Sequence, residues 1–177
     1  MRILCYLASI VIANVVTARF ASFEIGMFIV PMGTFFVGAT FIFRDLVQNK
    51  YGRKKTYLFI FIALLLSAAV SFSLGDTLMI VAASALSFII SETADTEIYT
   101  RLKLSMAWRV LYSGIVGGLL DSTVFVIVGL SPLGAGFIPW AAVPAAIVGQ
   151  ILVKTIMQML GVFIIIQGQT LREKRFA

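Results

Sequence analysis

Asp121 is an isolated carboxylate in a long apolar segment. It is the only charged residue between Val110 and Leu130, where the chain reads VLYSGIVGGLLDSTVFVIVGL. A helix of this length is long enough to cross a bilayer. A carboxylate at that depth costs on the order of 3 kcal/mol on insertion scales, so it normally faces a partner, a cavity or a ligand. The residue type and its position therefore predict a contact with a ligand or with a buried cation.

Lys154 is the cation that the sequence offers to Asp121. Gln150, Lys154 and Gln158 follow each other at intervals of four residues and form a polar ridge on an otherwise apolar helix. Lys154 lies roughly 20 Å from the cytoplasmic end of that helix, which is too deep for snorkelling. Counted inward from Arg109, Asp121 lies within about one turn of the same depth. We therefore expect an ion pair between Asp121 and Lys154.

A second group of carboxylates ends another apolar run. In the segment SETADTEIYTRLK, helical spacing places Glu92, Asp95, Thr96 and Tyr99 on one face. Glu97 points elsewhere and is expected to pair with nearby basic residues at the membrane interface. Glu92 lies more than one turn deeper in the run, which favours a role in ligand binding.

A face of small and polar residues runs along the second apolar segment. Its members recur at every third or fourth position: Thr34, Gly38, Phe41, Asp45 and Gln48. Two interpretations of Asp45 stay open, an ion pair with Arg44 or the basic loop at the interface, and a place in the ligand site. Gly114 and Gly118, in contrast, have the spacing of small residues at which membrane helices pack closely.

These residues are embedded in a chain with the composition of a membrane protein. Of its 177 residues, 60% are hydrophobic and 12% are charged, and the mean hydropathy is +1.04. The chain is too apolar for a soluble domain. Its pattern predicts an all-α polytopic membrane protein, a bundle of about six transmembrane helices that form one transporter domain over residues 1–177. The spans are expected near Ile3–Ala18, Phe28–Gln48, Thr56–Leu74, Thr77–Tyr99, Val110–Leu130 and Ala141–Ile166.

The basic residues are distributed as the positive-inside rule describes. With these spans, one side collects Arg2, Lys50, Arg53, Lys54, Lys55, Arg101, Lys103, Arg109, Arg172, Lys174 and Arg175, whereas the opposite loops carry Arg19. Both termini are therefore expected to be cytoplasmic. The pI of about 9.8 then reflects membrane anchoring rather than nucleic-acid binding, and the basic tail LREKRFA is expected to contact lipid headgroups.

Several kinds of chemistry are excluded by residues that the chain lacks. It has no histidine and a single cysteine, Cys5, so it can form neither an imidazole metal site nor an internal disulfide. It also lacks a phosphate-binding loop ending in Gly-Lys-Ser/Thr. We expect no metal, no cofactor and no catalytic residue. An intramembrane aspartyl protease would pair Asp95 with Asp121, but GGLLD is not the Gly-x-Gly-Asp pattern of that class.

Four motifs carry a resemblance to a known family. The runs FIFRDLVQNKYGRKK, SETADTEIYTRLK, SGIVGGLLDSTVF and GQILVK, in this order and spacing, resemble the queuosine precursor transporter family, also called the vitamin uptake transporter family. The resemblance implies a six-helix importer of 7-cyano- or 7-aminomethyl-7-deazaguanine in the bacterial inner membrane. It also implies that the characteristic polar residues are Asp45, Asp121, Gln150 and Lys154. The chain departs from the family where Arg44 replaces a more usual threonine and Asn49 an acidic residue.

A guanine-like ligand matches this set of polar side chains. Its ring N–H and exocyclic amine are parallel donors that one carboxylate can accept, and its carbonyl needs a donor. Glu92 or Asp121 can accept, whereas Lys154, Gln150 or Asn14 can donate. The aromatic residues that could stack on the ring are Phe35, Phe41 and Tyr99. The predicted substrate-binding residues are Asn14, Asp45, Glu92, Asp121, Gln150 and Lys154.

The expected partners are the lipid bilayer and this small molecule, with no nucleic acid, and homo-oligomerisation stays open. The alternative function is the substrate-binding subunit of an energy-coupling-factor vitamin importer, which docks on ATPase partners. The first span lacks the Ala-xxx-Ala docking signature of that class.

Overall fold

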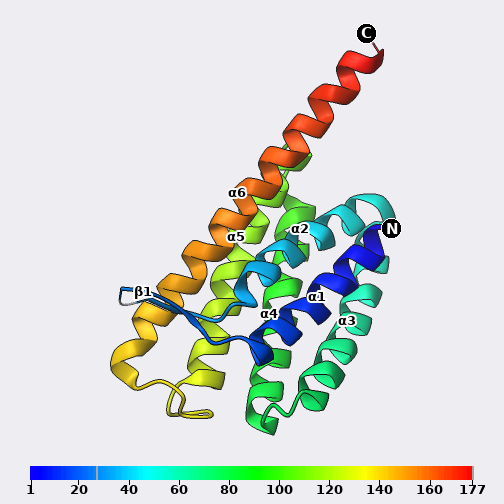
Figure 1. The fold of residues 1–177 in the computed structure, drawn as a ribbon. Helices are drawn as coiled ribbons and strands as arrows, with labels where there is room; N and C mark the ends of the chain where they lie inside the picture. Colours follow the sequence, from blue (N-terminus) through cyan, green and yellow to red (C-terminus); the bar gives the residue numbers. More distant parts are fainter. Residues whose placement is uncertain (27, 177) are drawn as a thin grey trace.

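The computed structural model describes residues 1–26 and 28–176, which form six long helices and a short hairpin (Figure 1). The helices are α1 (Arg2–Arg19), α2 (Thr34–Tyr51), α3 (Arg53–Ser73), α4 (Leu78–Arg101), α5 (Met106–Phe125) and α6 (Val143–Phe176). The antiparallel hairpin pairs β1 (Phe23–Ile25) with β2 (Phe28–Val30). Two short helical turns, η1 (Val126–Leu130) and η2 (Trp140–Ala142), flank the last loop. The side chains of the basic tail, for which lipid contacts were predicted, lie outside the described part.

Two predicted spans differ from the helices that form. The second span was expected over residues 28–48, but residues 28–30 form β2 and α2 begins at Thr34. Pro31 explains this, because a proline restricts the residue before it to extended backbone and has no N–H to donate. Val30 accordingly pairs with Phe23 and is buried beside α6. The last span was expected to end at 166, yet α6 continues to Phe176, because the end of an apolar run marks the membrane and not the end of a helix.

The bundle has a polar interior and an apolar surface. Among the described side chains, twenty of the buried ones are polar or charged and twenty are apolar, whereas a soluble protein rarely buries charged side chains fully. Phe61 and Leu65 are each more than half exposed. Within the described residues, five helices are long and apolar enough to cross a membrane, namely α1, α3, α4, α5 with η1, and η2 with α6, while α2 carries three charged residues. The chain is thus an all-α, multi-pass membrane protein.

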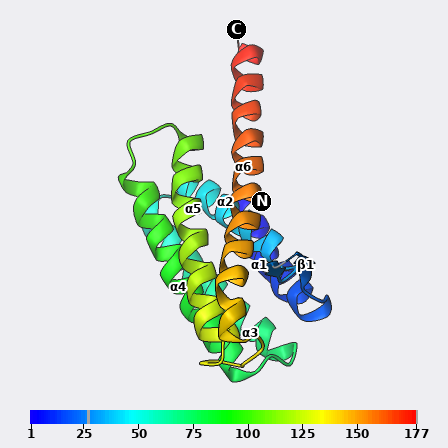
Figure 2. The same cartoon turned by 90° about the vertical axis from the view of Figure 1, so that its left-hand side faces the viewer.

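The segments rich in basic residues share one end of the bundle. The N-terminus, the α2–α3 turn and the α4–α5 loop lie toward the end from which α6 projects (Figures 1 and 2). Gly52 makes the α2–α3 turn with a φ of +79°, a backbone conformation that favours glycine. The α3–α4 turn and the α5–α6 loop lie at the opposite end. The charge pattern therefore corresponds to a real asymmetry between the two ends of the fold.

Candidate functional site

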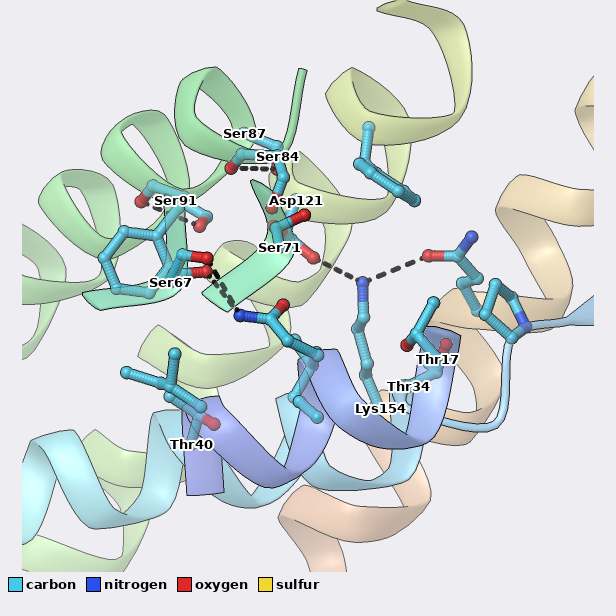
Figure 3. A pocket seen from close by; sticks show the side chains of 18 of the residues that line it. Thr17, Thr34, Thr40, Ser67, Ser71, Ser84, Ser87, Ser91, Asp121 and Lys154 are labelled. Carbon is cyan, nitrogen blue, oxygen red and sulfur yellow. Dashed lines mark hydrogen bonds and ion pairs between the residues drawn. The ribbon is translucent and has the colours of Figure 1, made fainter. Parts of the chain in front are cut away.

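A cavity of about 120 Å³ lies among the six helices, and every helix contributes to its wall. The lining combines serine and threonine hydroxyls with the charged groups of Asp121 and Lys154 (Figure 3). The amides of Asn14 and Gln150 and the carboxylate of Glu92 complete its polar part. An engineered apolar cavity of about 150 Å³ holds benzene. The cavity is therefore close in size to one that holds a single six-membered ring, and its lining is polar enough to orient a ligand.

The cavity is open at one end and closed at the other. Thr17 at its rim is exposed, and Asp76 in the α3–α4 turn is partly exposed. Phe41 and Glu92 at the inner end are each 1% exposed. Because the α3–α4 turn lies opposite the basic loops, the open end faces away from them.

A row of serines on two helices forms one side of the cavity. Ser67 and Ser71 come from α3, and Ser84, Ser87 and Ser91 come from α4. Ser87 and Ser91 donate their hydroxyl hydrogens to carbonyls three residues earlier on their own helix, at 3.1 and 3.2 Å. Their lone pairs therefore remain to accept from a ligand. Sequence reasoning missed these serines, although their spacing of three and four residues was a usable signal.

The predicted ion pair between Lys154 and Asp121 is confirmed. Lys154 Nζ lies 2.7 Å from Asp121 Oδ2 and donates to Ser122 Oγ at 2.7 Å and to Gln150 Oε1 at 3.3 Å. The Lys154 side chain is 2% exposed and that of Asp121 is 14% exposed. Gly118 faces this lysine, because a Cβ there would touch Lys154 Cβ at 3.4 Å. The pair thus holds α5 against α6 and leaves the carboxylate accessible from the cavity.

The amide side chains of the polar ridge play different parts. Gln150 lines the cavity, and its buried Nε2 has no hydrogen-bond partner within the described residues. A free buried donor is uncommon and suits a ligand carbonyl. Gln158 lies one turn further along α6, is fully buried against Gly114, and is not part of the cavity wall. The close packing predicted for Gly114 therefore serves a polar side chain.

Asn14 lies in the cavity wall, but its donor is already used. Its Nδ2 donates to Ser67 Oγ at 2.9 Å and to the Ser67 carbonyl at 3.3 Å. This amide therefore connects α1 to α3 across the cavity. The donor expected from Asn14 for a ligand carbonyl must instead come from Gln150, because the three N–H donors of Lys154 are used by Asp121, Ser122 and Gln150.

A second buried cluster surrounds Arg44 just beyond the inner end of the cavity. Arg44 Nη2 lies 2.9 Å from Asp45 Oδ1 and also contacts Asp95, and Arg44 Nε lies 3.3 Å from Glu92 Oε2. Nη1 donates to Gln48 and Thr96, at 2.9 Å each. Glu92 is the member that also lines the cavity. The cluster therefore ties α2 to α4 where the cavity ends.

Asp45, one of the predicted substrate-binding residues, is not in the cavity wall. It is completely buried, pairs with Arg44, and accepts a hydrogen bond from Ser113 Oγ at 3.4 Å. The ion pair proposed for it at the membrane interface does form, but inside the bundle. The contacts of Arg44 with Asp95 and Glu92 were not predicted, because only the packing of α2 against α4 brings these side chains together.

Glu97 behaves as the sequence predicted. It lies 2.5 Å from Arg53 Nη2 and 3.6 Å from Arg101 Nη2, and it accepts from the Tyr57 hydroxyl at 2.5 Å. Its side chain is 23% exposed. Glu97 is therefore a surface carboxylate on the same helix as buried Glu92.

The comparison with known families agrees with this architecture. Residues 57–167, more than half of the chain, match the family described as "Putative vitamin uptake transporter". The chain belongs to the vitamin uptake transporter family. No curated protein and no solved structure matches it. The family match runs from α3 into α6, so it includes the cavity residues Glu92, Asp121, Gln150 and Lys154. In a vitamin uptake transporter, a cavity inside the membrane bundle is the expected place for the transported molecule, and the function is transport rather than catalysis.

Proposed function

We propose that this vitamin uptake transporter imports a 7-deazaguanine precursor of queuosine, 7-cyano- or 7-aminomethyl-7-deazaguanine, across the bacterial inner membrane. The observation that carries the proposal is the ring-sized cavity, which presents two carboxylates beside an unpaired amide donor. The four sequence motifs shared with queuosine precursor transporters support the choice of ligand, and the family match supports uptake as the activity.

The cavity offers complementary groups for each edge of a deazaguanine. The ring N–H and exocyclic amine can donate to Asp121 or Glu92, which are the carboxylates of the wall. The carbonyl can accept from the free Nε2 of Gln150. Three phenylalanines of the wall are available to pack on the ring: Phe41, Phe88 and Phe125.

The orientation of the fold supports uptake from outside. Under the positive-inside rule, the end with the basic loops is cytoplasmic. The open end of the cavity, near Thr17 and Asp76, then faces the outside, and the Arg44 cluster separates the cavity from the cytoplasm. This is the outward-facing arrangement expected of an importer before it takes up its ligand.

The test is restoration of queuosine in a strain that lacks precursor synthesis and its own importer. Cells that express this chain and receive either precursor at low concentration are expected to accumulate queuosine in tRNA. Glu92→Gln should abolish the restoration, whereas Glu97→Gln, a matched change on the same helix, should preserve it. If neither precursor restores queuosine while the protein is in the membrane, the proposed substrate is wrong. Copurification of ATPase subunits would instead support the energy-coupling-factor alternative.

A further inference from the structure

The buried cluster around Arg44 contains more acidic than basic groups. Arg44 contacts three carboxylates, those of Asp45, Glu92 and Asp95, and the four side chains are at most 1% exposed. With every group ionised, one positive charge would face three negative charges. A buried charge without a partner is strongly unfavourable, and neighbouring carboxylates avoid full ionisation by sharing a proton.

The carboxylate oxygens of the cluster depend largely on one donor group, the guanidinium of Arg44. Three of these oxygens, Oδ1 of Asp45, Oε2 of Glu92 and Oδ2 of Asp95, face Arg44 and have no other hydrogen bond of good geometry within the described residues. Oδ1 of Asp95 has neither an ion pair nor such a hydrogen bond among those residues. Tyr6 of α1 borders the cluster. Its hydroxyl is fully buried beside Glu92, Arg44 and Asp95; it makes no hydrogen bond of good geometry with the described residues, but Glu92 lies close enough to interact with it. A proton bound to a carboxylate would supply the donor that these atoms need.

The neighbouring helices do not supply the missing positive charge. The other ionisable groups around the cluster are Tyr6, Tyr99, Arg109, Asp121 and Lys154. Lys154 is paired with Asp121, which adds a further negative charge near Glu92. Arg109 lies over the ring of Tyr99, with its guanidinium carbon 4.5 Å from the ring centre. Lys154 is therefore neutralised by Asp121, and Arg109 forms no ion pair with a carboxylate of the cluster in the described structure, so the excess negative charge stays with the cluster.

We propose that the three carboxylates around Arg44 form a proton-binding site, and that Glu92 couples this proton to the transported molecule. The coupling part rests on the proposed function. Glu92 belongs to both structures, because it lines the cavity and contacts Arg44. Its distance to Arg44, 3.3 Å, exceeds the 2.9 Å between Arg44 and Asp45, so it is the partner that a ligand can draw away more readily.

The proton would move in two steps. It first enters from water at the open end of the cavity and forms an O–H bond on Glu92. A ligand that donates hydrogen bonds requires Glu92 ionised, so ligand binding breaks this O–H bond and a new one forms on Asp95 or Asp45. Neither aspartate lines the cavity, and both lie beyond its inner end. The proton thereby moves in the same direction as the ligand, and its release to the cytoplasm completes symport without any other reactant.

Infrared spectroscopy of the full-length protein tests the proton site without any ligand. In lipid at neutral pH, we expect a carbonyl stretching band of a protonated carboxylic acid. Carboxyl-labelling with ¹³C-aspartate or ¹³C-glutamate identifies the residue type without a substitution. The band should be lost or altered in Glu92→Gln, Asp45→Asn or Asp95→Asn and unchanged in Glu97→Gln. Absence of the band in the folded wild-type protein, or its loss in Glu97→Gln alone, would overturn the proposal.

Proteoliposomes test the coupling separately. With 7-cyano-7-deazaguanine as the probe, an inward proton gradient should raise the initial uptake rate at least tenfold, and an inward sodium gradient should not. Uptake that responds to sodium and ignores the proton gradient would refute proton coupling. If the infrared band is present and uptake occurs but neither gradient raises its rate, the proton site stands and the coupling is rejected. If no uptake occurs at all, the proposed substrate is rejected as well.

Discussion

Replacement of the Asp121–Lys154 pair separates a structural from a functional role of these charges. In Asp121→Asn, buried Lys154 loses its counter-ion but keeps Ser122 Oγ at 2.7 Å and Gln150 Oε1 at 3.3 Å as acceptors. Breaking a buried pair costs about 3–5 kcal/mol. Because two acceptors remain, we expect Asp121→Asn to lower the free energy of unfolding by the smaller of these values, about 3 kcal/mol. This loss corresponds to a fall of roughly 6–12 °C in the unfolding midpoint.

The reverse replacement should cost less. In Lys154→Gln, the remaining carboxylate of Asp121 is 14% exposed and borders the cavity, so water can solvate it. We expect Lys154→Gln to lower the free energy of unfolding by about 2 kcal/mol. In the double variant no charge is left unpaired, so its stability should return to within about 1 kcal/mol of the wild type. If each single variant is less stable than the wild type and the double variant is not, the two residues are energetically coupled.

Two measurements on the same cells separate the roles. Membrane abundance and thermal unfolding in detergent report stability, and the initial uptake rate of 7-cyano-7-deazaguanine reports function. We expect the double variant to recover abundance and still fail to transport, with Glu97→Gln as the control that retains both. Full transport by the double variant would refute the functional interpretation of the pair. Wild-type stability of Asp121→Asn alone would refute the energetic argument.

Two further predictions concern topology and helix packing. In a Cys5→Ser background, single cysteines at Leu133, which is 66% exposed, and at Lys54 should label from opposite sides of the membrane, and labelling of both from outside would contradict the proposed orientation. Gly114→Ala should lower membrane abundance, because its Cβ would overlap the buried Gln158 side chain; adding Gln158→Ala should restore it, and Gly118→Ala, with an ordinary 3.4 Å contact, should be tolerated. Equal membrane abundance of Gly114→Ala and Gly118→Ala would show that the Gln158 side chain can move away from the added methyl group at little cost.

The sequence by itself was sufficient for the features that depend on composition or on position along one helix. Hydropathy predicted the membrane class, and the distribution of basic residues predicted which loops share an end. The pairing of Asp121 with Lys154 was also predictable, since a fixed helical rise gives the depth of each residue and few other ions lie at that depth. Pro31 was a local signal too, and the start of α2 was missed because the apolar run was given more weight than the proline.

Only the tertiary structure decided which side chains surround the cavity. The Arg44 cluster depends on the rotation of α2 relative to α4, and helical periodicity gives the face of each helix but not the face that it meets. For that reason Asp45 was assigned to the ligand site, although it lies behind Arg44, and the serines of α3 and α4 were overlooked. A membrane helix can bury a stripe of polar side chains against any neighbouring helix that supplies their hydrogen-bond and ion-pair partners. The choice among neighbours is made by the packing of the whole bundle, because each contact must satisfy its polar groups and its close helix approaches together.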